Sequence, residues 1–393
     1  MIDIPLTAAL VRGAAELEQT DRGLRPHRLP AGARSQTPDP QLALVEAQPS
    51  GVRIAMTTRA TALELDTLPT TTVYAGAPPR PAGLYDLVVD GLLVEQKQGS
   101  GGDTVTTDLA TGTTTRSEGG VGTVRFDGLL DALKLVEVWL PWNEPTLLVA
   151  LRTDQPVEPV DDDRTRWLHH GSSISHGSNA ASPTGTWPAQ AARRAGVDLI
   201  NLGLGGSALL DPFVGRTMRG TAADLISAKI GINLVNADLM RMRAFVPAVH
   251  GFLDTIRDGH PDTPLLVVSP LFCPIHETTP GPAALDAHAL AEGIVRFRAT
   301  GDPTDVAAGK LTLGTIRDAL ARIVAERSRT DPHLHHLDGR HLYGPDDVTD
   351  HPLPDNLHPD AATHRLIGER FATAVFGPGA PFGAHTKRSH DHD

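Results

Sequence analysis

The sequence lacks several features that would place a protein in a specialised class. It has a single cysteine, Cys273, so no disulfide can form within the chain. No run of about 18 apolar residues occurs, so no membrane-spanning helix is expected. The N-terminal segment has no basic start followed by an apolar stretch and a cleavage site, so no secretory signal is expected and the predicted location is cytoplasmic.

Basic residues are outnumbered as well. The chain has 35 Lys and Arg against 47 Asp and Glu, which gives a net charge of −12. Because phosphate binding depends on clustered basic side chains, this balance argues against a nucleic-acid partner and favours a neutral or weakly polar small molecule. No His, Cys and Asp set with the spacing of zinc ligands precedes the C-terminal tail, so neither a metal nor another cofactor is expected.

What the sequence does have is a change of pattern near its middle. Residues 1–160 contain short, partly alternating runs rich in Val and Thr, separated by Gly and Pro, which predicts an antiparallel β-sandwich domain. A polar stretch, 156–163, is interpreted as the linker that follows it. The runs are 52–56, 62–65, 85–89, 121–126, 135–140 and 146–151.

Beyond the linker, strand-like runs alternate with apolar residues at helical spacing. This alternation predicts an α/β domain over residues 165–378, with a doubly wound parallel sheet between helices. In such sheets the site lies beyond the carboxyl ends of the strands. Residues 379–393 are predicted to be a disordered tail. Strands are expected at 167–170, 197–202, 225–231 and 265–269, and helices near 186–195, 245–256, 316–324 and 367–371.

Two short segments carry the residue types of nucleophilic catalysis. Ser173 follows a strand within a Gly-flanked turn, 171–177, where a hydroxyl is exposed and a substrate can approach closely. A serine hydroxyl needs a base, and the base needs an orienting group. Asp355 and His358 supply both within one turn of chain, so we expect His358 to take the Ser173 proton while Asp355 fixes the ring.

Donors for a tetrahedral oxyanion are expected at the ends of neighbouring strands. Gly206 follows the second strand of the α/β half, although its neighbour Gly205 is an alternative. Asn233 follows the third strand, and its amide is a further candidate donor. An alternative for Asn233 is that it caps the helix that follows.

The order of these blocks resembles that of the SGNH/GDSL hydrolases, over roughly residues 167–376. The blocks are Gly-x-Ser, then Gly, then Gly-x-Asn, and finally Asp-x-x-His. The resemblance implies a flavodoxin-like, three-layer fold for this half of the chain. It also gives the four family roles to Ser173, Gly206, Asn233 and His358, with Asp355 completing a Ser-His-Asp triad.

The resemblance has two further consequences for the site. It makes the Ser173 backbone amide an additional oxyanion donor. It also exposes one departure, because the family's first block often reads Gly-Asp-Ser and here Ser172 stands in the place of the Asp. That Asp is not the triad acid, so the assignment of the triad is unaffected, but the hydrogen bonding of the turn must differ.

The whole chain is similar to a two-domain branch of the family, in which a β-sandwich precedes the catalytic domain. This branch includes GDSL lipases and esterases of actinobacteria and an acyltransferase of natural-product biosynthesis. Sandwiches attached to related esterases often resemble carbohydrate-binding modules, which makes a glycosylated substrate conceivable.

Three functions are therefore compatible with the sequence. The first is a serine esterase that hydrolyses carboxylic esters through an acyl-enzyme. The second is an acyltransferase that delivers the acyl group to a polyketide or sugar hydroxyl with the same residues. The third is a carbohydrate-binding protein with a degenerate catalytic half, which the intact Ser173, Asn233 and His358 disfavour.

Overall fold

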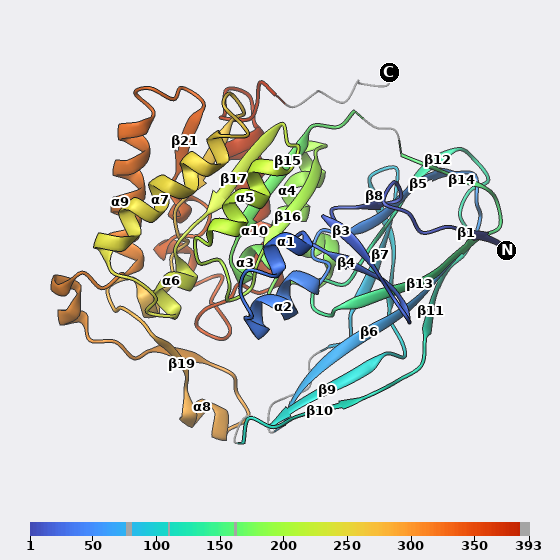
Figure 1. The fold of residues 1–393 in the computed structure, drawn as a ribbon, viewed down its shortest axis with the longest axis horizontal. Helices are drawn as coiled ribbons and strands as arrows, with labels where there is room; N and C mark the ends of the chain where they lie inside the picture. The colour runs from blue at the N-terminus through green and yellow to red at the C-terminus, as the bar shows by residue number, and fades with distance from the viewer. Residues whose placement is uncertain (76–80, 109–110, 161–162, 386–393) are drawn as a thin grey trace. The chain divides into compact units, whose positions relative to one another are not determined.

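The computed structural model describes residues 1–75, 81–108, 111–160 and 163–385, and the chain divides into two compact units (Figure 1). Each unit has its own sheets and its own apolar core. The first unit consists of Met1–Arg34, Pro38–Asp163 and Ser182–Thr184, and the second of Ser35–Thr37, Arg164–Ala181 and Gly185–Asp393.

The described part of the first unit is built from two sheets. In the eight-stranded sheet the order is β10-β9-β6-β13-β4-β3, with β1 also on β13 and β11 also on β6. In the six-stranded sheet the order is β14-β5-β12-β7-β8, with β2 also on β5. The strands of the first sheet are β1 (Ile2–Ile4), β3 (Glu16–Thr20), β4 (Gly23–His27), β6 (Leu63–Ala75), β9 (Asp103–Asp108), β10 (Thr114–Ser117), β11 (Gly122–Phe126) and β13 (Thr146–Thr153). Those of the second are β2 (Val11–Arg12), β5 (Arg53–Thr58), β7 (Leu84–Val89), β8 (Leu92–Gln98), β12 (Lys134–Trp139) and β14 (Val157–Pro159), and the two helices are α1 (Ala31–Arg34) and α2 (Pro40–Ala47).

Alternation along the strands explains the core of this unit. In β6, Leu63 and Leu65 are buried. Glu64 and Asp66, which alternate with them, form ion pairs with Arg152 of β13. One face of the strand therefore joins the core and the other remains polar. Apolar residues from both sheets form that single core, among them Ile54, Met56, Leu87, Val124, Val136, Val138 and Leu151.

The N-terminal region is β-rich, as the sequence predicts, and each of the six runs overlaps a strand. Two details differ from the expectation. The pairing of β6 with β9 is parallel, so the first sheet is mixed. The stretch interpreted as a linker contains β14, which pairs with β5, and Asp161 and Asp162 of that stretch lie outside the described residues.

The second unit contains a five-stranded parallel sheet in the described residues, in the order β16-β15-β17-β18-β21. Its strands are β15 (Arg166–Gly171), β16 (Asp198–Gly203), β17 (Leu225–Lys229), β18 (Leu265–Val268) and β21 (Leu334–Leu337), and a separate two-stranded sheet pairs β19 (Ala283–Leu285) with β20 (Phe297–Ala299). Its helices are α3 (Ser173–His176), α4 (Trp187–Ala195), α5 (Pro212–Gly220), α6 (Ile232–Asn236), α7 (Met242–Arg257), α8 (Ala287–Ala291), α9 (Leu313–Arg327) and α10 (Ala361–Phe371).

Strands β15, β16, β17 and β18 are buried along almost their whole length, as expected for parallel strands covered on both faces. Every residue of β17 and β18 is buried. Helix α4 packs on α10, while α7 packs on α5 and on α9 (Figure 1). An aromatic cluster fixes β15, because the Trp167 ring lies 5.1 Å from Phe371, 5.2 Å from Phe376 and 6.2 Å from Trp187.

Part of the predicted C-terminal tail is folded. Residues 379–385 form turns, and Phe382 is fully buried with its ring 5.6 Å from that of Phe376. Residues 386–393 of the predicted tail lie outside the described residues. None of the helices in the described chain is long and apolar enough to cross a membrane.

Candidate active site

Ser173 lies where the first strand of the parallel sheet ends. Strand β15 stops at Gly171, Ser172 is the N-cap of α3, and Ser173 is the first residue of that short helix. The turn packs so closely on β16 that a Cβ added to Gly203 would lie 2.4 Å from the backbone nitrogen of His176. Glycine at position 203 is therefore needed to hold the turn against the sheet.

The structure brings the three predicted triad residues together. Ser173 Oγ lies 2.9 Å from His358 Nε2, and His358 Nδ1 lies 2.7 Å from Asp355 Oδ2. Because an ionised carboxylate can only accept, Nδ1 carries a proton, and Nε2 of a neutral ring is left to accept from the Ser173 hydroxyl. The hydroxyl, the ring and the carboxylate thus form a continuous hydrogen-bonded relay.

Local backbone geometry holds the carboxylate in place. Asp355 Oδ1 accepts hydrogen bonds from the backbone N–H groups of Leu357, at 2.9 Å, and His358, at 2.6 Å. The turn is completed by Asn356, which has a φ of 65°. Burial disfavours the charge on Asp355, but the hydrogen bonds from the His358 ring and from these N–H groups outweigh that effect and lower the pKa of the carboxyl.

A phenylalanine that the sequence analysis did not single out borders the relay. The ring of Phe297, in β20, meets the His358 ring edge to face at 5.7 Å between centroids. The Phe297 backbone N–H donates to the Asp355 carbonyl at 2.9 Å, and the Asn356 side chain donates to the Phe297 carbonyl at 3.2 Å. Strand β20 therefore supports the turn that carries Asp355 and His358.

The two candidate oxyanion donors belong to connected segments. Gly206 is exposed, with a φ of 74°, in the loop after β16. Asn233 is buried in α6, and its Oδ1 accepts the backbone N–H of Ala208 at 3.2 Å. The N-cap of α6 is Gly231, so Asn233 does not cap this helix. Because Oδ1 is engaged, the Nδ2 group of Asn233 is the end available as a donor.

Other side chains of the types found in catalytic and metal sites are buried in the fold. His169 is fully buried and lies 2.8 Å from Ser175 Oγ and 2.7 Å from Ser227 Oγ, and burial lowers its pKa well below the usual value. Cys273 is buried. Among the described residues, no three His, Cys, Asp or Glu side chains are grouped to hold a metal ion.

A comparison with protein families matches residues 166–273 to the GDSL-like lipase/acylhydrolase family. The matched segment runs from β15 to the loop after β18, and so includes Ser173, Gly206 and Asn233. No curated protein matches the chain.

Solved structures resemble the chain over nearly its whole length. A salicylyl acyltransferase from a tetracycline biosynthetic pathway is 28% identical, with a TM-score of 0.74, over 94% of this chain and 95% of that chain. A GDSL-like lipase from Bacteroides ovatus, described as putative, is 18% identical, with a TM-score of 0.64, over 93% and 94%. A family two carbohydrate esterase from Clostridium thermocellum, solved with cellohexaose, is 14% identical, with a TM-score of 0.54, over 83% and 92%.

The last two structures are similar to the chain in fold alone. The family match and the acyltransferase show a GDSL/SGNH hydrolase-like fold with a β-rich N-terminal part. The family match and the more similar acyltransferase agree with the order of the sequence blocks and confirm the resemblance drawn from them. The chain is an enzyme that acts on esters, as a hydrolase or an acyltransferase, and its residues 166–273 match the GDSL-like lipase/acylhydrolase family.

Proposed function

We propose that this protein is a serine esterase that hydrolyses carboxylic esters through an acyl-enzyme on Ser173. The observation that carries the proposal is the relay from Ser173 Oγ through the His358 ring to the Asp355 carboxylate, with separations of 2.9 and 2.7 Å. A hydroxyl hydrogen-bonded to a base that is itself oriented by a carboxylate is the arrangement that acyl transfer by serine requires.

In the first half of the reaction, Ser173 Oγ attacks the ester carbonyl carbon while its proton passes to His358 Nε2. The resulting tetrahedral intermediate collapses, the alcohol leaves with the proton from His358, and the acyl group stays on Ser173. In the second half, water attacks the acyl carbon, gives its proton to His358, and releases the acid as the proton returns to Ser173 Oγ. Asp355 remains ionised and stabilises the charged ring.

The oxyanion of each tetrahedral intermediate is assigned to three donors. These are the backbone N–H groups of Ser173 and Gly206 and the side-chain Nδ2 of Asn233. The contact between Asn233 Oδ1 and the Ala208 N–H supports the assignment, because it couples Asn233 to the loop that carries Gly206. Fixed donors of this kind stabilise charge without reorganising during the reaction.

The test of the nucleophile is Ser173→Ala. We expect the rate of p-nitrophenyl acetate hydrolysis to fall by at least about a thousandfold, with the melting temperature unchanged. A fluorophosphonate probe should label the wild type and leave the variant unlabelled, and Ser175→Ala serves as a matched control for the probe. Equal labelling of the wild type and of Ser173→Ala would contradict the proposal.

An acyltransferase is the second candidate. It is favoured by the likeness to the salicylyl acyltransferase, which covers 94% of this chain at 28% identity. The acyl-enzyme is the same, and the two functions differ only in whether water or an acceptor hydroxyl reaches the acyl carbon. Candidate acceptors are hydroxyls of polyketides or sugars.

Product partitioning separates these two functions. An acyl thioester is supplied with and without candidate alcohols, and the ester product is compared with the free acid. An esterase releases acid at the same rate with every acceptor, whereas a transferase forms ester at the expense of acid. Ser173→Ala should abolish both products, which separates enzymatic transfer from background alcoholysis or hydrolysis.

The finer architecture is part of the same proposal. The strand order of the parallel sheet and the grouping of α4 with α10 and of α7 with α5 and α9 support a doubly wound, three-layer domain. The shared core of the two N-terminal sheets supports a β-sandwich. A sugar-binding role for the sandwich with an inactive α/β half is the weaker alternative, because the relay is complete.

A further inference from the structure

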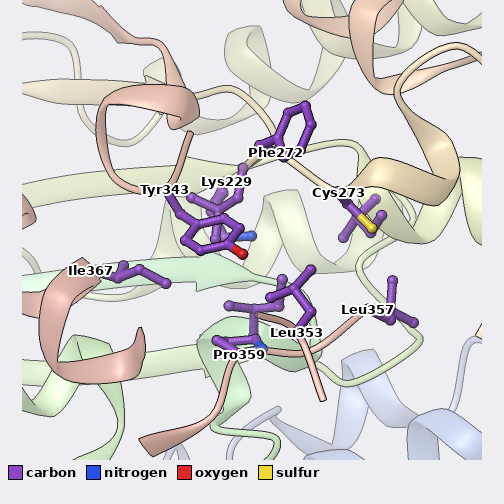
Figure 2. A pocket seen from close by; sticks show the side chains of 11 residues that line it. Lys229, Phe272, Cys273, Tyr343, Leu353, Leu357, Pro359 and Ile367 are labelled. Atoms are coloured by element: carbon purple, nitrogen blue, oxygen red, sulfur yellow. The ribbon is translucent and has the colours of Figure 1, made fainter. Parts of the chain in front are cut away.

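A lysine is buried beside the turn that carries the nucleophile. Lys229, the last residue of β17, is 3% exposed. Its Nζ lies 3.5 Å from Oγ of Ser172, the residue that immediately precedes Ser173. Lys229 lines a cavity whose other lining is almost entirely apolar and includes Ile174, Ile232 and Leu271. Figure 2 shows its side chain among those of Phe272, Tyr343 and Ile367, which line the same cavity.

This cavity is too small to hold an acyl group. Its volume is about 10 Å³, which is about the least that can hold a single water molecule. The side chains of Ile174 and Leu357 line it, and these residues adjoin Ser173 and His358 in the chain. Lys229 therefore contacts the turn that carries Ser173 and lines a cavity too small for a substrate.

The charge of Lys229 is poorly compensated. Within the described part of the chain, Ser172 Oγ is the hydrogen-bond partner of Nζ, and no carboxylate forms an ion pair with it. Burial lowers the pKa of Lys229 to about 8. A buried cation without a counter-ion destabilises the folded state, so a fold that keeps one has a reason outside stability.

A second buried lysine shows how the chain satisfies such a group elsewhere. Lys134, in β12, is 5% exposed, and its Nζ donates to the carbonyl oxygens of Ala60 at 2.7 Å, Leu130 at 2.7 Å and Ala132 at 3.3 Å. Three acceptors thus match the three ammonium protons. Lys229 is as little exposed to solvent, but its Nζ makes a single, long hydrogen bond, which sets it apart from a structural lysine.

We propose that Lys229 is a positioning residue of the acyl-transfer site, whose buried ammonium holds Ser172 and stabilises the oxyanion that forms when Ser173 attacks the ester. The inference rests on the proposed role of Ser173 as nucleophile. During attack, the proton leaves Ser173 Oγ for His358. Negative charge then forms on the carbonyl oxygen of the ester that Oγ attacks. A cation beside the preceding residue, in surroundings of low dielectric, favours that charge.

If Lys229 acts in this way, the rate of acyl transfer depends on pH in the alkaline range. The charged form of Lys229 is lost as pH rises through about 8, so acyl transfer should slow there. Burial raises the pKa of Cys273 and of Tyr343, which line the same cavity, to about 12. On the neighbouring strand β15, burial holds the pKa of His169 well below its usual value.

The remaining groups near Lys229 are engaged in contacts of their own. His170 of β15 has its Nδ1 2.8 Å from the Leu202 carbonyl oxygen. Asp355 and His358 lie on the loop whose apolar residues face the cavity, and they are paired with each other. Lys229 is therefore the group to which we assign a loss of activity near pH 8.

The test is Lys229→Met, which keeps the length of the side chain and removes the charge. We expect kcat for p-nitrophenyl acetate at pH 7 to fall by about tenfold to a hundredfold, with KM little changed. The fall in rate near pH 8 should disappear from the pH–rate profile of the variant. Rates are followed at the isosbestic wavelength of p-nitrophenol, so that the readout itself does not change with pH. The melting temperature should stay the same or rise, because an unpaired buried charge has been removed.

Lys134→Met is the matched control. It removes three hydrogen bonds, so its melting temperature should fall while its kcat and its pH profile remain those of the wild type. A Lys229→Met enzyme with wild-type kcat and an unchanged limb near pH 8 would overturn the inference. The inference would also be overturned if the melting temperature of Lys229→Met fell and its activity were lost only in proportion to the unfolded fraction. Ser173→Ala, assayed in parallel, shows separately whether the proposed nucleophile is wrong.

Discussion

Replacing Asp355 with Asn alters one atom of the proposed relay and has a consequence that the geometry makes calculable. The two carboxylate oxygens have different partners. Oδ2 accepts from His358 Nδ1 at 2.7 Å, whereas Oδ1 accepts from the backbone N–H groups of Leu357 and His358 at 2.9 and 2.6 Å. An Asn side chain offers one oxygen and one NH2 group, so it can satisfy only one of the two sides.

The substituted amide has two possible orientations. In the first, its oxygen keeps both backbone bonds and its NH2 group faces His358 Nδ1. The ring must then accept at Nδ1 and carry its proton on Nε2, where it can no longer take the proton of Ser173. In the reverse orientation, the ring keeps its productive tautomer, but the NH2 group faces two backbone donors. Each unpaired buried donor costs about 1–3 kcal/mol, so this orientation lies roughly 2–6 kcal/mol higher.

That gap sets the expected loss of rate. With a tenfold change for each 1.4 kcal/mol, kcat for p-nitrophenyl acetate should fall about thirtyfold to twenty-thousandfold, although Asn has the shape of Asp. Asp355→Ala is the comparison, because it leaves the ring free to choose its tautomer. Melting temperatures check that both variants fold. An Asn variant within threefold of the wild type, or far more active than the Ala variant, would refute the tautomer argument.

Two further predictions concern the oxyanion site and acid stability. Asn233→Ala should lose about 2.7–4 kcal/mol of transition-state stabilisation, seen in kcat with KM little changed, and a change confined to KM would make Asn233 a substrate-binding residue instead. Burial lowers the pKa of His364 to about 4, from 6.5 in the unfolded chain. As pH falls, the unfolded state therefore takes up the proton of His364 at a higher pH than the folded state. The contribution of neutral His364 to the free energy of unfolding is complete above about pH 6.5 and is lost as pH falls toward 4. Between pH 7 and 4, the free energy of unfolding of His364→Gln, measured by urea titration, should therefore fall by roughly 3 kcal/mol less than that of the wild type. Equal falls in the two proteins would show that His364 does not cause the acid sensitivity.

The sequence predicted elements best where burial imposes a regular pattern. Alternation in β6 and β11 and the apolar runs of β16 and β18 are direct consequences of packing on one or both faces. Strand β21 was missed because its sequence, Leu-His-His-Leu, has polar residues at its centre. Strands β3 and β4 were missed because they are mostly polar, and β4 contains Pro26.

Pairing between distant strands is harder to predict than the strands themselves. Strand β6 continues to Ala75, and its last part, from Thr70, pairs in parallel with β9. Neither direction nor partner is encoded in the local alternation of residues 70–75, because a parallel and an antiparallel neighbour both suit the same period of two. Only the fold of the whole unit determines which strand lies beside it.

The two buried lysines explain why the sequence located the relay and overlooked its neighbour. Ser173, Asp355 and His358 lie in short blocks whose order and spacing can be recognised, and the structure brings them within hydrogen-bonding distance. Lys229 has no such block: its one signal is a lone lysine at the end of a buried apolar strand, and Lys134 has much the same local setting. What separates the two is the number of acceptors around each Nζ, three for Lys134 and one for Lys229. Those acceptors come from other segments of the chain, so the distinction exists only once the chain is folded.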